Sequence, residues 1–203
     1  GIKVTGHLCS VSFTEAVELG IDNLEHGLFT NCDYVKDKQP DECPTAMVAA
    51  GAATKPNDPA VKRTFDLMIK NNVPMTSTLS VYELFVPKRP TKDQRTLDAM
   101  APEVREDYLR ARDQIDNAAR STYTIEVFKN AMAYEKAFFD AGGLLGAGVD
   151  PTGNGGALPG YGDQRNFELL REAGFTPEQV VQIMTLNGAK ILGVQKDLGS
   201  IEK

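Results

Sequence analysis

Residues 1–27 read GIKVTGHLCSVSFTEAVELGIDNLEHG and carry the pattern that decides the fold. The segment 1–8 is rich in β-branched residues and runs into a Gly-His pair, which predicts a strand. A helix should follow, because Ser12 and Glu15 have the spacing of a capping box and a glycine closes the segment. The apolar run in 21–27 predicts a second strand. Strand, helix and strand in this order are typical of βα units around a parallel sheet.

The alternation of strands and helices continues along the rest of the chain. A polar, proline-rich loop is expected over 31–59. The other elements are predicted as helices at 58–72, 131–143, 163–174 and 176–193, and as strands at 73–82 and 144–151. The sequence therefore predicts an α/β fold of four parallel strands with outer helices.

A long charged region, Lys88 to Arg120, separates the third and fourth predicted strands. Its acidic and basic residues are interleaved, which favours a solvated pair of helices, with a lid over an active site as the alternative. We therefore place an inserted, charged helical region at 88–130. The glycine-rich segment 151–162 is expected to be a loop that joins strand to helix, with a cradle for a substrate carboxylate as the alternative.

Composition excludes several classes of function. The chain has 203 residues, 41% of them hydrophobic and 25% charged, which is ordinary for a folded globular protein. A formal net charge of -6 provides no basic field for phosphates, so nucleic acid is not an expected partner. The apolar runs are too short to span a membrane, and the first residues do not resemble a signal peptide. These features favour a cytoplasmic location and leave a secreted parent protein open.

The cysteines give little support for a structural framework. Cys9, Cys32 and Cys43 are odd in number and contain no CxxC pair. Neither a set of disulfides nor a cysteine zinc site is therefore indicated. A bridge between Cys32 and Cys43 stays open for an extracellular protein.

Three side chains of types that can bind a metal stand where apolar runs stop. His7 follows KVTG, His26 follows NLE, and Asp150 follows GAGV. The carboxyl ends of parallel strands build the active site in βα architectures, so these side chains should meet at one rim. Two imidazoles and one carboxylate form a donor set that suits a divalent metal such as zinc. Taken singly, each residue also fits a hydrogen-bonded packing position or a turn.

The alternation of side chains along a strand adds a further expectation. His26 and Leu24 should share one face of their strand, and Glu25 should lie on the other. Glu25 is therefore expected to orient the strand end rather than to bind metal. Ser77 and Ser80 have no histidine nearby in the sequence, which argues against a serine nucleophile.

Three longer segments resemble the amidohydrolase superfamily of metal-dependent hydrolases, in particular its imidazolonepropionase-like and prolidase-like branch. They are GHLCSVSFTEAVELGIDNLEHGL, LLGAGVDP and TLNGAKILGVQKDLGSIEK. The resemblance implies the C-terminal half, strands 5 to 8, of a TIM (β/α)8 barrel. Residues 1–203 would then be a partial catalytic domain that lacks strands 1 to 4 and the accessory β-sheet domain. The first-strand His-x-His pair and the strand-four lysine or glutamate of the family are absent.

The same resemblance implies a role for each candidate. His7 and His26 would be metal ligands, and Asp150 would be both a metal ligand and the catalytic proton shuttle. The reaction would be hydrolysis of a C-N bond in a small-molecule amide or cyclic amide by metal-activated water. One or two divalent ions, with zinc favoured, would serve as cofactor.

Four strands cannot close a small barrel, which needs about eight. We therefore expect a piece of a longer enzyme that is inactive alone, or a homo-oligomer, or a chain completed by a separate N-terminal half. The alternative function is a non-catalytic half-barrel that self-associates or needs such a complementing half.

Overall fold

The computed structural model describes residues 2–89, 93–151 and 155–201. Four strands form one parallel sheet in the order β1-β2-β3-β4. Their bounds are β1 Thr5–Gly6, β2 Asn23–Glu25, β3 Met75–Ser77 and β4 Leu145–Ala147. The predicted α/β fold with parallel strands is confirmed.

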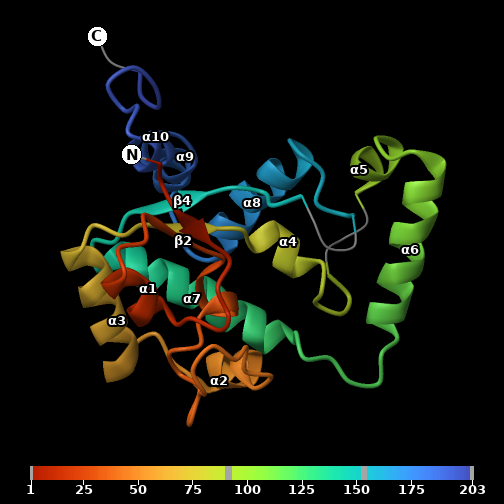
Figure 1. Ribbon diagram of the computed structural model, residues 1–203. Coiled ribbons are helices and arrows are strands. Elements are labelled where there is room, and N and C mark those ends of the chain that lie inside the picture. The colour runs from red at the N-terminus through yellow and green to blue at the C-terminus, as the bar shows by residue number, and fades with distance from the viewer. Residues whose placement is uncertain (1, 90–92, 152–154, 202–203) are drawn as a thin grey trace.

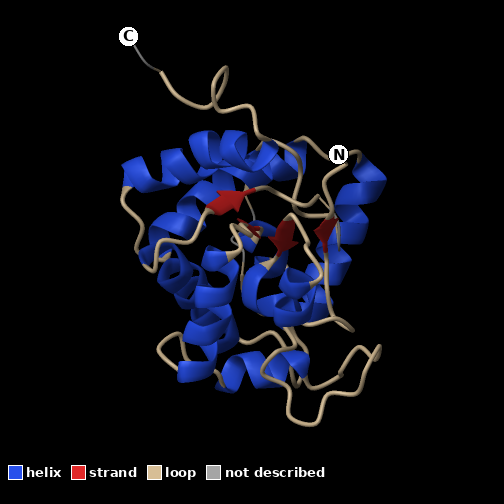
Figure 2. Ribbon diagram, turned by 60° about the vertical axis from the view of Figure 1, so that its left-hand side comes forward, coloured by secondary structure: helices blue, strands red, loops and turns tan. Residues whose placement is uncertain are grey.

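Helices connect the strands and surround them (Figure 2). In the view of Figure 1, α1, α3 and α7 lie on one side of the strands, and α9 and α10 lie on the other. The α-helices are α1 Phe13–Glu18, α2 Met47–Ala53, α3 Pro59–Lys70, α4 Leu79–Glu83, α5 Gln94–Asp98, α6 Pro102–Asp116, α7 Ile125–Asp140, α8 Tyr161–Glu172, α9 Pro177–Gln182 and α10 Gly188–Leu192. A 3-10 turn, η1 Gly27–Thr30, follows β2, and a π-helical turn, η2 Ile183–Asn187, joins α9 to α10.

The start of α1 has the predicted capping box. The Ser12 hydroxyl accepts a hydrogen bond from the Glu15 amide at 3.1 Å, and the Glu15 carboxylate accepts one from the Ser12 amide at 2.7 Å. The helix ends at Glu18 with Leu19 as its C-cap, and Gly20 follows with a φ of 85°. Because the left-handed region costs glycine little, this residue can reverse the chain into β2.

The strands are shorter than the sequence predicts. The predicted strand 73–82 ends at Ser77, and the rest of that segment forms α4. A short apolar run fits a buried helix as well as a strand, and every residue of α4 is buried. The predicted loop 31–59 also contains a helix, α2, whose sequence MVAAGAA has the helix-favouring alanines that the proline-rich flanks obscure.

The two faces of the sheet differ in chemistry. Leu24, Met75 and Leu145, from three adjacent strands, are fully buried against the helices. Thr5 and Thr76 lie on the opposite face, where they line a cavity. The apolar face therefore packs against helices, and the polar face carries the side chains that line the cavity.

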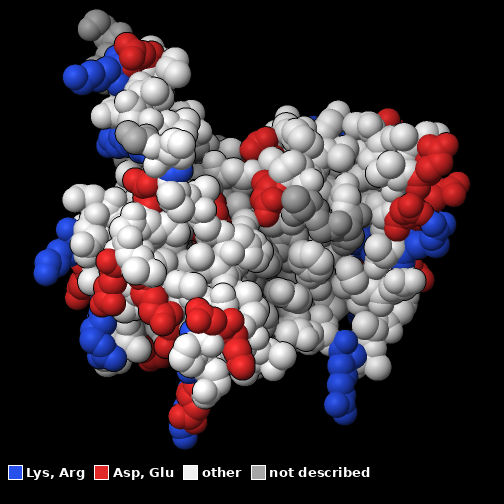
Figure 3. All heavy atoms as spheres, in the orientation of Figure 1, with Lys and Arg blue, Asp and Glu red and all other residues white. Residues whose placement is uncertain are grey.

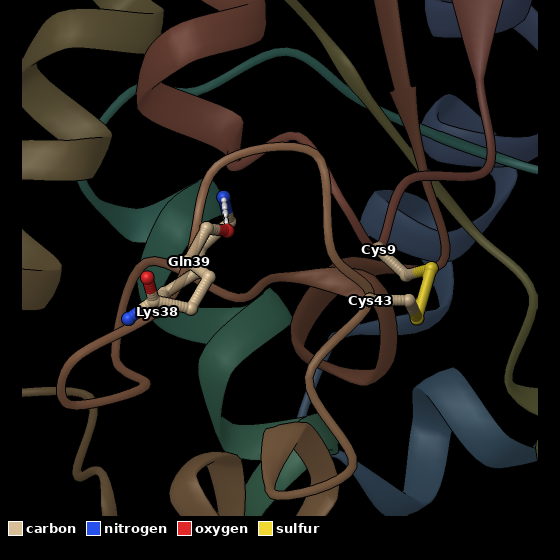
Figure 4. The surroundings of a disulfide bond; sticks show 4 residues. All are labelled: Cys9, Lys38, Gln39 and Cys43. Atoms are coloured by element: carbon tan, nitrogen blue, oxygen red, sulfur yellow. Dashed lines mark hydrogen bonds between the residues drawn. A yellow bond between two sulfur atoms is a disulfide. The ribbon is translucent and has the colours of Figure 1, made fainter.

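The cysteine pairing differs from the alternative left open by the sequence. Cys9 forms a disulfide with Cys43, across a sequence separation of 34 residues (Figure 4). Cys32 is a buried free thiol, so the alternative of a bridge between Cys32 and Cys43 is wrong. Residue count alone cannot choose a partner, whereas the fold brings the loop after β1 beside the loop before α2.

The exposed face drawn in Figure 3 has its charged side chains mainly at the margins, with a few acidic groups near the centre. Within the described residues, the helices are too short or too polar to cross a membrane.

Candidate active site

A cavity of about 660 Å³ lies on the polar face of the sheet, at the carboxyl ends of the strands. His7, His26 and Asp150 all line it. These are the three residues that the sequence singles out, from positions 7, 26 and 150 of the chain. Parallel strand pairing brings them to the same rim, as in other βα architectures.

The three side chains are close neighbours. His26 Nε2 lies 3.6 Å from Asp150 Oδ2. The rings of His7 and His26 have centroids 4.5 Å apart and meet edge to face, at an interplanar angle of 62°. His26 is therefore the central member, between an imidazole and a carboxylate.

The backbone at His26 breaks the expected alternation. Leu24 is buried on the helix side, but Glu25 and His26 both line the cavity. The prediction that His26 shares a face with Leu24 is therefore wrong. Its physical reason is a φ of 69° at His26, in the left-handed region, which turns this side chain towards the cavity. Asp150 has a similar conformation, with a φ of 46°.

Thr78 holds the ring of His26 from the other side. The Thr78 hydroxyl lies 2.7 Å from His26 Nδ1, and both side chains are buried. Burial and, to a smaller extent, the charge of His7 lower the pKa of His26, Asp150 opposes them, and the net result is a pKa of about 4. The imidazole is therefore neutral at pH 7. The tautomer that donates its Nδ1 proton to Thr78 leaves the Nε2 lone pair facing Asp150, as in a metal ligand.

The sequence reasoning did not single out Thr78. Its signal is the TST pattern at 76–78, which repeats a hydroxyl side chain at alternate positions of a strand. Thr76 and Thr78 both line the cavity. Hydroxyls spaced two apart at a strand end can therefore indicate supporting residues of a site.

His26 Nε2 and Asp150 Oδ2, the donor pair of the site, have a spacing that fits a shared cation. Two ligands about 2.1 Å from one ion in tetrahedral arrangement lie about 3.4 Å apart. The separation of 3.6 Å between His26 Nε2 and Asp150 Oδ2 is close to this value. Across residues 2–89, 93–151 and 155–201, however, no group of three or more His, Cys, Asp or Glu side chains is arranged to hold a metal ion. His7 therefore stands beside the pair without completing a three-ligand group.

A polar network lies on the same face as the cavity and links three strands. The side-chain amide of Asn23 donates to Thr5 Oγ1 at 3.2 Å, to Glu25 Oε1 at 2.6 Å and to Thr76 Oγ1 at 2.8 Å. The Thr5 hydroxyl also donates to the Glu25 carboxylate. Glu25 is thus engaged in cross-strand hydrogen bonds beside the candidate ligands.

An aromatic wall forms one side of the cavity, made by Phe29, Tyr82, Phe85 and Tyr123. Phe29 and Tyr82 stack with centroids 4.0 Å apart, and the Tyr82 ring lies 5.6 Å from that of His26. Burial raises the pKa of Tyr82, so the phenol stays protonated. The wall can pack against an apolar group of a ligand beside the polar donors.

Arg165 belongs to an ion-pair network outside the cavity. Its guanidinium lies 2.7 Å from Glu83, whose side chain is fully buried. Arg89 lies 2.6 Å from the same carboxylate and 2.8 Å from Glu172. Two guanidinium groups compensate one buried negative charge and join α4 to α8, so the role of Arg165 is structural.

Comparison with known proteins agrees with this architecture. The amidohydrolase family matches residues 60–203, a span that includes Asp150 but begins after His7 and His26. Comparison with curated proteins gives no match.

Solved structures with the same fold include two enzymes. One is an amidohydrolase, with a TM-score of 0.55 and 19% identity over 99% of this chain and 35% of the other. Another is a Xaa-Pro dipeptidase with methionine bound in its active site, with a TM-score of 0.53 and 19% identity over 99% of this chain and 36% of the other. This chain thus spans about a third of their length, as expected for part of a TIM barrel. On the match over residues 60–203, the chain belongs to the amidohydrolase family.

Proposed function

We propose that this chain supplies the C-terminal half of the catalytic barrel of a metal-dependent hydrolase that cleaves C-N bonds in small amides or cyclic amides. The observation that carries the proposal is the pairing of His26 Nε2 with Asp150 Oδ2 at 3.6 Å, with His7 alongside. All three stand at the carboxyl ends of parallel strands, where βα enzymes place their catalytic groups. The imidazolonepropionase-like and prolidase-like branch of the family is the one we assign.

In this proposal His7, His26 and Asp150 would hold a divalent ion, with zinc favoured, through imidazole nitrogens and a carboxylate oxygen. Bound zinc supplies a Lewis acid and a water molecule with a pKa near 7. Asp150 accepts a proton from the attacking water and returns it to the leaving nitrogen, first as general base and then as general acid. Thr78 keeps the His26 ring in position, and the aromatic wall packs against the apolar part of the amide.

Catalysis further requires groups that lie outside this chain. Its two histidines are both in the cavity already, so the family's first-strand His-x-His pair has to come from elsewhere. Ile2 and Val4 near the β1 edge are 97% and 57% exposed. An exposed apolar strand edge can pair with further strands. We therefore infer that a complementing N-terminal half completes the barrel and that this chain alone is inactive.

A second function is favoured by two of the same observations. The described residues hold no finished three-ligand metal group, and the apolar side chains of Ile2 and Val4 are exposed next to the edge strand β1. A non-catalytic half-barrel that forms a homo-oligomer through this edge would have both properties. Metal binding and self-association separate the two functions.

Zinc binding by the purified chain tests the proposal. We expect close to one equivalent of zinc in a competition titration with a chromophoric chelator. His26→Ala and Asp150→Asn should each remove most of this binding, because each deletes one member of the donor pair. Asp107→Asn is the matched control, since this carboxylate is exposed on α6 and should leave binding unchanged.

Zinc that binds equally to the His26→Ala variant would contradict the assigned site. A chain that binds no zinc and sediments as a homo-oligomer would favour the second function.

A further inference from the structure

The loop that carries His7 has few internal restraints. It runs from the end of β1 at Gly6 to the start of α1 at Phe13. Residues 8–11 make no hydrogen bond to any other residue that the structure describes. Leu8 and Val11 are partly buried against the core, and Cys9, between them, is joined covalently to Cys43. The disulfide is therefore the strongest restraint on this loop.

His7 depends on that restraint because its own side chain is exposed. Its ring meets that of His26 edge to face, with centroids 4.5 Å apart. The ring of His26, by contrast, is buried and fixed by Thr78. The position of His7 relative to His26 is thus set mainly by the backbone between β1 and Cys9.

The other end of the disulfide is attached to a well-held part of the fold. Cys43 lies four residues before Met47, the first residue of α2, which lines the same cavity. The side chain of Asn130 on α7 donates to the carbonyl oxygens of Gly51 at 2.8 Å and Thr54 at 2.6 Å, and so fixes the C-terminal end of α2. The disulfide therefore connects the His7 loop to the α2 and α7 layer.

We propose that Cys9 and Cys43 form a redox-sensitive positioning link for His7. In the oxidised state the link holds His7 beside His26, and reduction frees the loop so that His7 leaves this position. The consequence for metal affinity rests on the function proposed above. The change in His7 position does not.

The chemistry of the step is ordinary thiol-disulfide exchange. A dithiol reductant gives two electrons and two protons, the S–S bond breaks, two cysteine thiols form, and the reductant closes to its own disulfide. Cys43 is exposed and Cys9 is half-buried, so a reductant can reach the bond. Cys32 does not compete, because it is 0% exposed and burial raises the pKa of its thiol. Secretory compartments would keep the link closed, and a glutathione-rich cytosol would open it.

The two histidines make the test unusually direct. Because His7 and His26 are the two histidines of the sequence, a carbon-proton correlation spectrum should contain two imidazole Hε1 signals. The oxidised chain should show a nuclear Overhauser contact between the two rings. The double variant Cys9→Ser/Cys43→Ser should lose this contact while its circular dichroism stays that of the parent. Cys32→Ala, which keeps the disulfide, is the matched control and should keep the contact.

Reduction of the parent chain with a phosphine, which does not alter the sequence, is the second arm and should have the same effect as the double variant. Zinc affinity should fall about tenfold in the double variant, a change of the size produced by removing a supporting residue of a metal ligand. A ring-to-ring contact that survives both the double variant and reduction would overturn the proposal. If the contact is lost but the parent binds no zinc, the proposed hydrolase site fails and the positioning link stands.

Discussion

Glu135 on α7 offers a direct test of the packing behind the cavity. Its side chain is 1% exposed, and its Oε2 atom makes no hydrogen bond to another described residue. Burial raises the pKa of this carboxyl to about 8 from its ordinary value of 4.5, and nearby Ser77 lowers it by a smaller amount. The group is therefore protonated in the folded chain at pH 7 and ionised in the unfolded chain.

The sign and size of the effect follow from proton binding. Between pH 4.5 and about 8 the folded chain holds one proton more than the unfolded chain, so the free energy of unfolding falls as pH rises. The gap between the two pKa values corresponds to at most about 5 kcal/mol, at 1.36 kcal/mol per pH unit. Glu135→Gln removes the ionisable group and keeps its shape. We expect the variant to match the parent near pH 4 and to exceed its stability by several kcal/mol at pH 9.

Urea unfolding followed by circular dichroism at a series of pH values measures the difference. Glu126→Gln is the matched control, because Glu126 is an exposed glutamate at the start of the same helix. Hydrogen bonds from its own backbone and from Thr124 lower the pKa of Glu126, so this substitution should bring no gain at high pH. A stability difference between Glu135→Gln and the parent that is the same at pH 5 and pH 9 would refute the reasoning.

Three further substitutions test the structure. Gly27→Ala should destabilise the chain by about 1–2 kcal/mol in urea unfolding, because Gly27 has a φ of 58° and an added Cβ would lie 3.3 Å from Oε1 of the buried Glu135 side chain. Full parental stability would argue against this backbone conformation. Arg165→Met should cost about 3 kcal/mol by the same assay, since it leaves buried Glu83 with one arginine, and a neutral result would show that the pair contributes little. Thr78→Val should lower zinc affinity about tenfold in a chelator competition without unfolding the chain, because the His26 ring loses its hydrogen-bond partner, and unchanged affinity would remove Thr78 from the site.

Features encoded over a few neighbouring residues were predictable from the sequence. The capping box of Ser12 and Glu15 depends on spacing within a single segment, and the parallel strands follow from the alternation of strand and helix patterns along the chain. The convergence of His7, His26 and Asp150 was predictable for a related reason, since each stands at the end of a parallel strand.

Features that depend on the assembled fold were not predictable. The left-handed backbone at His26 changes which residues face the cavity, and the intrinsic preferences of histidine do not predict this conformation. The partner of Cys9 follows from how two distant loops meet, which cysteine spacing does not encode. The segment after Ser77 becomes α4 because a short apolar run suits either a helix or a strand, and the surrounding packing decides.

The amide of Asn23 has a consequence for the alignment of the strand ends. Only two residue pairs, Thr5 with Asn23 and Gly6 with Leu24, define the register between the described parts of β1 and β2. So few backbone pairs leave lengthwise sliding poorly opposed, and the amide spanning three strands acts as a lock against it. A slip of two residues along β1 would carry His7 about 7 Å along the strand axis. The position of His7 relative to His26 along the strand axis therefore depends on the uncharged side chain of Asn23, which lies farther from the rim of the sheet.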